Sequence, residues 1–301
     1  DQVWLFLFFL SAFAIKIPIF PLHSWLPHAY ISSPIPVLLI LTGAMSKAGA
    51  YGIIRFCLPL FPDAVDKFGL VIAFGAAAGI VYGAWIAVAQ RDLKALVAYS
   101  SISHLGFIAL GIFALNGEGI EGSVLQMVNH GIIASALFVI VGILEKRMNT
   151  RSLNDFRGLG KAMPLLYGMF MLITLAALGL PGLNGFVGEF LILMGVWTSL
   201  LLADLSAIYV LMAGLAIVFA SIYMLHMFQG AMQEKNDKIP EGLTDINSRE
   251  FGLLLPACIL VVLIGLYPKP FIDRVTPSVE SILTMEKTLN LHAGEGKGDH
   301  H

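Results

Sequence analysis

The stretch PIPVLLILTGAMSKAGAYGIIRFCL, residues 34–58, decides the fold class because it is apolar over a membrane-spanning length and carries a lysine near its middle. A bilayer core requires about 20 apolar residues per helix. Lys47 lies too deep in this stretch to reach the bilayer surface easily, and the small residues Gly43 and Gly49 would let another helix, or water, come close. We therefore expect a transmembrane helix with a functional buried charge.

The composition of the whole chain supports a membrane protein. Of the 301 residues, 57% are hydrophobic and 13% are charged, and the mean hydropathy is +0.83. A soluble domain carries about 25% charged residues, so lipid is the expected solvent over most of the surface, with a soluble oligomer of very large interfaces as the alternative. The net charge of −2 excludes a nucleic-acid footprint.

Eight apolar segments are candidate membrane spans. They cover residues 3–22, 34–58, 68–90, 95–114, 121–144, 163–203, 205–230 and 251–268. The polar stretches between them are short, so we expect one all-α transmembrane bundle over residues 1–270. A polar tail over residues 271–301 should follow it.

Two of the eight segments are interrupted. Pro18, Pro21 and Pro27 follow the helical run of the first segment, and residues 180–188 divide the sixth into two apolar halves. Proline removes a backbone donor, and unwound backbone survives at membrane depth only where protein or a water-filled cavity satisfies it. Paired broken helices are typical of ion sites in transporters, and simple proline kinks are the alternative.

Lysine and arginine in the connecting segments predict the orientation. The connections after spans 1, 3, 5 and 7 carry Arg91, Lys94, Lys146, Arg147, Arg151, Arg157, Lys161, Lys235, Lys238 and Arg249. The connections after spans 2, 4 and 6 carry only Arg55 and Lys67. The first group should face the cytoplasm of a bacterial inner membrane, which places the C-terminus on the periplasmic side.

Three ionisable residues, Lys16, Lys47 and Glu189, lie deep in apolar segments. Such a group costs roughly 2.5–3.5 kcal/mol at a helix centre, so a structural role alone is a poor reason to keep one. Burial disfavours the charged form, so a proton can be held and released. The alternatives are snorkelling of the lysines towards the interface and, for Glu189, a favourable interaction with a helix N-terminus.

His104 and His130 are the only histidines well inside spans 3 to 5. A single histidine in a core is often no more than a hydrogen-bonded packing residue. Together with Lys47, Glu189 and the serine-rich residues 99–104, the two histidines are better interpreted as steps of a hydrogen-bonded proton relay.

No other chemistry competes in the sequence. Cys57 and Cys258 both lie in apolar runs, which suggests neither a disulfide framework nor a metal site. The sequence has no cysteine cluster for an iron–sulfur centre, no GxGxxG after a strand, no Walker loop and no paired-histidine haem pattern. We expect no cofactor, which leaves ion movement, a channel or a scaffold as function classes.

Five motifs resemble those of one family, the antiporter-like subunits of respiratory complex I and of Mrp-type antiporters. They are KIP (16–18), PLHSWLP (21–27), KAGAYG (47–52), RDLKALVAYSSISHLG (91–106) and GLPGLNGFVGEF (179–190). The resemblance extends to about residue 270, and the motifs together are highly specific. Where this chain has Glu189, Mrp proteins and the complex I subunits L and N usually carry lysine, so the chain looks like the third complex I subunit of this type.

The resemblance implies a fourteen-helix protein built from two inverted five-helix repeats, of which this chain would be helices 7 to 14. Lys16 would be the lysine of broken helix 7, Lys47 the central lysine and Glu189 the outlet residue of helix 12. His104 and His130 would be relay histidines. The implied function is proton translocation by a membrane-arm subunit of NADH:quinone oxidoreductase, beside subunits L and N and coupled to quinone reduction elsewhere in the complex.

The family's glutamate of helix 5, the partner of Lys16, would lie in an N-terminal part that this chain lacks, so we expect that the chain alone does not pump. His28 stands where many relatives have aspartate, and residues 31–34 are also unusual. His23 and His28 therefore either line an entry path or are simply interfacial. The rival functions are a sodium/proton antiporter or hydrogenase-linked subunit and, from another class, a structural subunit that does not conduct.

Overall fold

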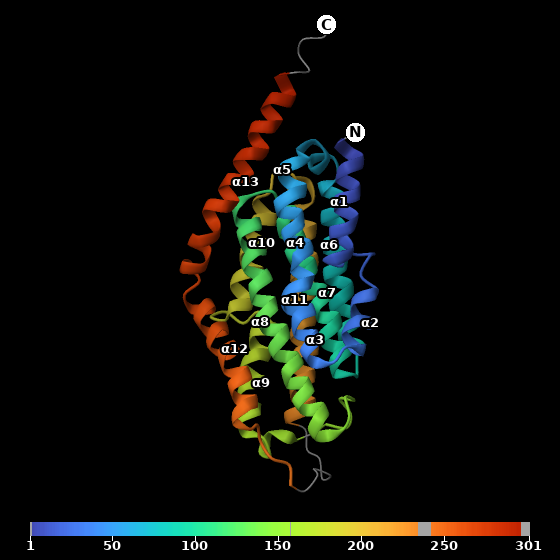
Figure 1. Ribbon diagram of the computed structural model, residues 1–301, viewed down its shortest axis with the longest axis vertical. Coiled ribbons are helices and arrows are strands. Elements are labelled where there is room, and N and C mark those ends of the chain that lie inside the picture. Colours follow the sequence, from blue (N-terminus) through green and yellow to red (C-terminus); the bar gives the residue numbers. More distant parts are fainter. Residues whose placement is uncertain (1, 157, 234–241, 296–301) are drawn as a thin grey trace.

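Helices make up most of the described chain. The computed structural model describes residues 2–156, 158–233 and 242–295. Figure 1 shows an up-and-down bundle in which α1 (Gln2–Lys16) begins at one end and α13 (Lys269–Glu295) extends towards that same end. Arg157, Lys235 and Lys238, which entered the orientation prediction, lie outside the described residues.

The eight predicted segments all appear as apolar helices. The uninterrupted ones are the run α3–η1–α4–η2–α5 (Ile35–Ile40, Leu41–Met45, Ser46–Gly52, Ile53–Cys57 and Leu58–Leu60), α6 (Pro62–Ala89), α7 (Leu93–Ile112), α8 (Gly117–Met148), α11 (Ser206–Met232) and α12 (Ser248–Leu266). The interrupted ones are α1 with α2 (Trp25–Ser32), and α9 (Pro164–Ala177) with α10 (Asn184–Thr198). Within the described ranges, six runs are long and apolar enough to cross a membrane, and α1, α9 and α10 are shorter apolar helices. The predicted all-α membrane fold is confirmed.

The first break, between α1 and α2, packs against a glycine. The end of α1 lies on α4 at Gly49, where an added Cβ atom would be 2.6 Å from the carbonyl oxygen of Phe13 and 2.8 Å from the backbone nitrogen of Ile17. The indole of Trp25 donates a hydrogen bond of 2.9 Å to the carbonyl of Ile15. The protein itself thus satisfies part of the backbone that the break exposes.

The second break, residues 178–183 between α9 and α10, depends on two glycines. Gly179 and Gly182 have φ angles of 74° and 93°, in the left-handed region where a Cβ atom is strained. The nitrogens of Gly179 and Leu180 still donate to the carbonyls of Ala176 and Leu175, at 3.2 and 3.1 Å. Both predicted interruptions are therefore breaks in the helix rather than kinks.

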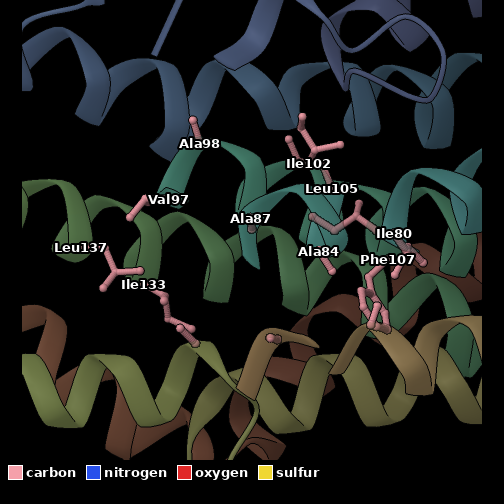
Figure 2. Packing of buried hydrophobic residues seen from close by; sticks show 14 of the residues in the cluster. Ile80, Ala84, Ala87, Val97, Ala98, Ile102, Leu105, Phe107, Ile133 and Leu137 are labelled. Carbon is pink, nitrogen blue, oxygen red and sulfur yellow. The ribbon is translucent and has the colours of Figure 1, made fainter. Parts of the chain in front are cut away.

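α7 is the innermost helix of the bundle. Of the residues in its most apolar stretch, 94% are buried, against 22% in the corresponding stretches of α11 and α12. Figure 2 shows Ile102 and Leu105 of α7 beside Ile80 of α6. An added Cβ on Gly83 of α6 would lie 2.7 Å from the backbone nitrogen of Ser103. Small residues that let backbones approach are typical of helix packing in lipid, and here they enclose the polar side chains of α7.

Three connections meet at the end of the bundle that carries most of the basic residues. An antiparallel β-bridge joins Asp92, between α6 and α7, to Ser152, between α8 and α9. Arg147, near the end of α8, donates to the carboxylate of Glu250 at 2.6 Å and to the carbonyl of Asp245 at 3.1 Å. These contacts tie the connection between α11 and α12 to the same end.

The C-terminal segment, expected as a polar tail over residues 271–301, is helical as far as Glu295. Val279 and Ile282 of α13 are buried, and the hydroxyl of Thr276 donates to the carboxylate of Glu121 on α8 at 2.6 Å. A helix of low mean hydropathy is stabilised when its apolar residues share one face, which composition alone does not reveal. Residues 296–301 lie outside the described residues.

The contact between α1 and α4 predicts an unequal effect of two alanine substitutions. Gly49→Ala should lower the stability of the full-length protein by about 1–3 kcal/mol, because the new methyl group overlaps the backbone of α1. Gly168→Ala on α9 is the control, since its Cβ would meet nothing within 4 Å. Thermal unfolding in detergent measures both, and equal midpoints would contradict the close packing of α1 on α4.

Candidate functional site

Lys47 is held at the centre of its span by a carbonyl and a histidine. It follows the π-helical turn η1, in which backbone hydrogen bonds join residues that are five rather than four positions apart. Its ammonium donates to the carbonyl of Thr42, five residues earlier, and Nζ lies 2.9 Å from Nδ1 of His130 on α8. Lys47 is 7% exposed, so these two partners replace water around its charge.

His130 continues the contact towards α7. Its Nε2 lies 3.3 Å from the hydroxyl of Ser101, which itself donates to the carbonyl of Val97 at 3.0 Å. Nε2 of His130 then carries the hydrogen, and Nδ1 is free to accept from Lys47. The ring centroids of His130 and His104 are 5.4 Å apart. Both rings are buried.

Glu189 is the far end of this arrangement. Its Oε1 lies 3.0 Å from Nδ1 of His104 and accepts a hydrogen bond of 3.4 Å from the amide of Gln126. Its Oε2 faces the second helix break, because an added Cβ on Gly179 would lie 3.0 Å from that oxygen. The buried hydroxyl of Tyr223 on α11 is also within electrostatic range of Glu189. Glu189 is 5% exposed.

These side chains form one continuous line, which we call the buried row: Lys47, His130, His104 and Glu189. Each of the four side chains can hold or release a proton, and each neighbours the next through a hydrogen bond or a ring contact. The row joins the start of α4, near the middle of the span Ile35–Leu60, to the break between α9 and α10. The contacts of Lys47 with His130 and of His104 with Glu189 are within hydrogen-bond reach, whereas transfer between the two histidine rings would need a bridging water or a ring movement.

Lys16 does not join the buried row. Its side chain is exposed at the end of α1, although its Cβ would lie 3.0 Å from a Cβ atom added to Gly49, two residues after Lys47. Within the described ranges, no hydrogen bond or ion pair reaches its ammonium group. The backbone of Lys16 thus lies close to the helix that carries Lys47, but no described contact joins the two side chains.

The two histidines of the first break have different surroundings. His23 is buried between the rings of Phe20 and Tyr82, at centroid distances of 5.2 and 4.6 Å. His28 is exposed on α2. Neither contacts the buried row among the described interactions, so a role in entry stays a prediction.

The prediction placed Lys94 in a polar connection, but it is buried in the first turn of α7. Lys94 is 6% exposed, and its ammonium lies 3.5 Å from the carboxylate of Glu145 and 3.4 Å from the carbonyl of Ser33. Residues at the ends of α2 and α8 therefore cover it. A lysine near a helix N-terminus interacts unfavourably with the helix dipole. This unfavourable position of Lys94 was the sequence signal that could have indicated a special environment.

Three buried amides were also missed by the sequence reasoning: Gln126 and Asn129 on α8, and Asn184 at the start of α10. The amide groups of Asn129 and Asn184 bond to each other. Uncharged amides inside apolar spans at a spacing of i and i+3 are a weak signal, but they do predict a shared polar helix face.

Comparison with known proteins relates the chain to membrane subunits of respiratory enzymes. Residues 1–216 match the family described as NADH:quinone oxidoreductase/Mrp antiporter, TM. Subunit M of NADH-quinone oxidoreductase from Mycobacterium tuberculosis is 40% identical over 280 residues, which are 93% of this chain and 50% of that protein. Subunit M from Rhodobacter capsulatus is 36% identical over 299 residues, 98% of this chain and 56% of that protein.

Solved structures share the fold. A chain of respiratory complex I from Thermus thermophilus superimposes with a TM-score of 0.87 at 34% identity, covering 95% of this chain and 59% of that one. A chain of the Mrp complex from a Dietzia species gives a TM-score of 0.79 at 20% identity, covering 91% and 58%, a likeness of fold alone. The chain spans about half the length of the curated relatives that it matches.

The position of Glu189 against the second break predicts different effects for two glycines with positive φ. Gly179→Ala and Gly182→Ala should lose similar stability, about 1–2 kcal/mol, because both force an L-residue into the left-handed region. Only Gly179→Ala should also change the infrared carboxyl band that Glu189→Gln removes, since its Cβ would touch Oε2, whereas the Gly182 Cβ would meet Leu266 at 3.9 Å. An unchanged band in Gly179→Ala would contradict the described position of Glu189.

Proposed function

This chain belongs to the NADH:quinone oxidoreductase/Mrp antiporter family of membrane subunits, and we propose that it is part of subunit M of a bacterial NADH:quinone oxidoreductase and moves protons along the buried row. The observation that carries this proposal is the unbroken sequence of contacts from Lys47 to Glu189. The identity with subunit M proteins of several bacteria supports the choice of subunit. Subunits L and N and the lipid bilayer are the proposed neighbours.

Electrostatic repulsion gives the buried row a direction of transfer. Two like charges about 4 Å apart repel by about 4 kcal/mol at an effective dielectric constant of 20. Lys47 and His130, joined at 2.9 Å, therefore disfavour simultaneous protonation. A proton that arrives at Lys47 favours the movement of a proton from His130 towards His104 and Glu189.

Lys16 would influence the charge of Lys47 without belonging to the buried row. It lies beside Gly49, two residues from Lys47, so its charge would act on Lys47 through space rather than through a hydrogen bond. In the complete protein a counter-charge near Lys16 would weaken that repulsion and let Lys47 keep its proton. Coupling to quinone reduction would then consist of changes in the charge near Lys16.

Removing the ammonium of Lys47 tests the proposed function directly. In the assembled complex, Lys47→Ala should abolish most of the proton pumping and quinone reductase activity, because the row loses its first proton carrier. Lys161→Ala, an exposed lysine in the connection between α8 and α9, is the control and should leave both activities unchanged. Pumping in membrane vesicles is measured after assembly has been confirmed by native electrophoresis.

The rival functions give other results in the same experiment. If Lys47→Ala assembles and pumps normally, the chain is a structural support and does not conduct. If pumping of wild-type protein depends on sodium concentration rather than on pH, the cation antiporter function replaces the proposal.

The proposed orientation can be tested by cysteine labelling. Both native cysteines, Cys57 and Cys258, are buried, so labelling of the wild-type background should be low. Lys161→Cys should react with a membrane-impermeant maleimide only from the cytoplasmic side, and Glu118→Cys, exposed at the other end of α8, only from the periplasmic side. The reverse pattern would contradict the orientation that the basic residues predict.

A further inference from the structure

α10, the helix that carries Glu189, begins inside the bundle without a side-chain cap. α7, α8 and α12 each begin after a residue whose side chain accepts a hydrogen bond from the first turn, namely Asp92, Asn116 and Asn247. α10 follows Leu183, whose side chain accepts none. The first N–H groups of a helix have no partner within the helix. Residues 178–183, which precede α10, are not helical. The position of its start therefore depends on neighbouring helices.

Two fully buried amides connect this start to α8. Nδ2 of Asn129 donates to the backbone carbonyl of Asn184 at 2.7 Å, and Nδ2 of Asn184 donates back to Oδ1 of Asn129 at 3.2 Å. Both side chains are 0% exposed. Breaking such a pair leaves buried polar atoms without a partner, which is unfavourable away from water. We call this pair the amide clasp.

The amide clasp lies within one helical turn of the buried row on α8 and within two turns on α10. On α8, Asn129 directly precedes His130, and Gln126, one turn earlier, donates to Glu189. On α10, Glu189 follows Asn184 by five residues, or about 7.5 Å along the helix axis. Because a helix moves as a rigid rod over this distance, a shift of the start of α10 along α8 also shifts Glu189 relative to His104.

We propose that the amide clasp is a positioning device for proton transfer, which fixes the start of α10 so that the Glu189 carboxylate stays 3.0 Å from His104. The inference rests on the proposed function of the buried row. Asn129 and Asn184 transfer no proton themselves. They act on the distance that a proton must cross between His104 and Glu189, and proton transfer is efficient only within hydrogen-bond reach.

A matched control exists at the other end of the same helix pair. Nδ2 of Asn116 donates to the carbonyl of Gly195 at 2.7 Å, which joins the start of α8 to the end of α10. This bond also holds the two helices together, but on α8 Asn116 lies 14 residues, about 21 Å, before His130, whereas Asn129 is adjacent to it. A packing role and a positioning role therefore predict different results for Asn116→Ala and Asn129→Ala.

The experiment compares Asn129→Ala, Asn184→Ala, the double variant and Asn116→Ala in the assembled full-length complex. Asn129→Ala removes both bonds and should lower turnover about tenfold, as small misplacements of reacting groups do, and should shift the pH profile of turnover. Asn184→Ala should have a smaller effect, because its backbone carbonyl still accepts from Asn129. The double variant should be no slower than Asn129→Ala. Asn116→Ala should lower thermal stability and leave the pH profile unchanged.

Each outcome decides between positioning and packing. If Asn129→Ala and Asn116→Ala have the same turnover and pH profile, the amide clasp only holds the helices together and the inference is wrong. If Asn129→Ala does not assemble, Asn184→Ala, which keeps the shorter bond, decides in the same way.

Glu189→Gln, measured in parallel, distinguishes failure of the inference from failure of the proposed function. Full pumping by Glu189→Gln would refute the function of the buried row, and with it the role of the clasp. An inactive Glu189→Gln beside a normal profile of Asn129→Ala would refute the amide clasp alone.

Discussion

The structure depends on the absence of water inside a bilayer, which obliges every backbone polar group at that depth to find its partner within the protein. This constraint explains why the breaks between α1 and α2 and between α9 and α10 occur only where other groups approach closely. The indole of Trp25 donates to a carbonyl in the last turn of α1, before the first break, and the amide of Asn129 donates to the carbonyl of the first residue of α10, after the second. It also explains why α7, which carries His104 and Ser101, is enclosed by the other helices.

The same constraint explains why the ionisable side chains of the buried row have one another as partners. Lys47 is bonded to a carbonyl and a histidine rather than to a fixed carboxylate, so its charge is tolerated without being locked in place. Glu189, with a histidine and an amide as its partners, is in a comparable position at the other end. The chemistry of the row thus follows from partners that are polar but not permanently charged.

The helix breaks connect this chemistry to the backbone. A continuous helix would satisfy its own carbonyl groups and hold its side chains at one spacing, whereas α10 begins at a point that α8 defines. Gly179 leaves space for the second oxygen of Glu189, and the amide clasp holds the first turn. Lys16, at the first break, is exposed, and the chain spans about half the length of the curated relatives that it matches.

The sequence by itself determined the membrane class, the eight helical segments, the two breaks and five candidate residues, four of which form the buried row. These features are local: hydropathy over 20 residues, proline and glycine in the backbone, and the cost of single charges in an apolar run all act within one segment. Only the tertiary structure decided which side chains meet. α7 is buried on almost all sides and its apolar residues are not gathered on one face, so no amphipathic stripe indicates its rotation about its own axis, and the contact between His104 and Glu189 cannot be predicted from one segment. For the same reason the burial of Lys94, the separation of Lys16 from the row and the pairing of Asn129 with Asn184 emerge only when the helices pack, because each depends on the depth and rotation of two helices at once.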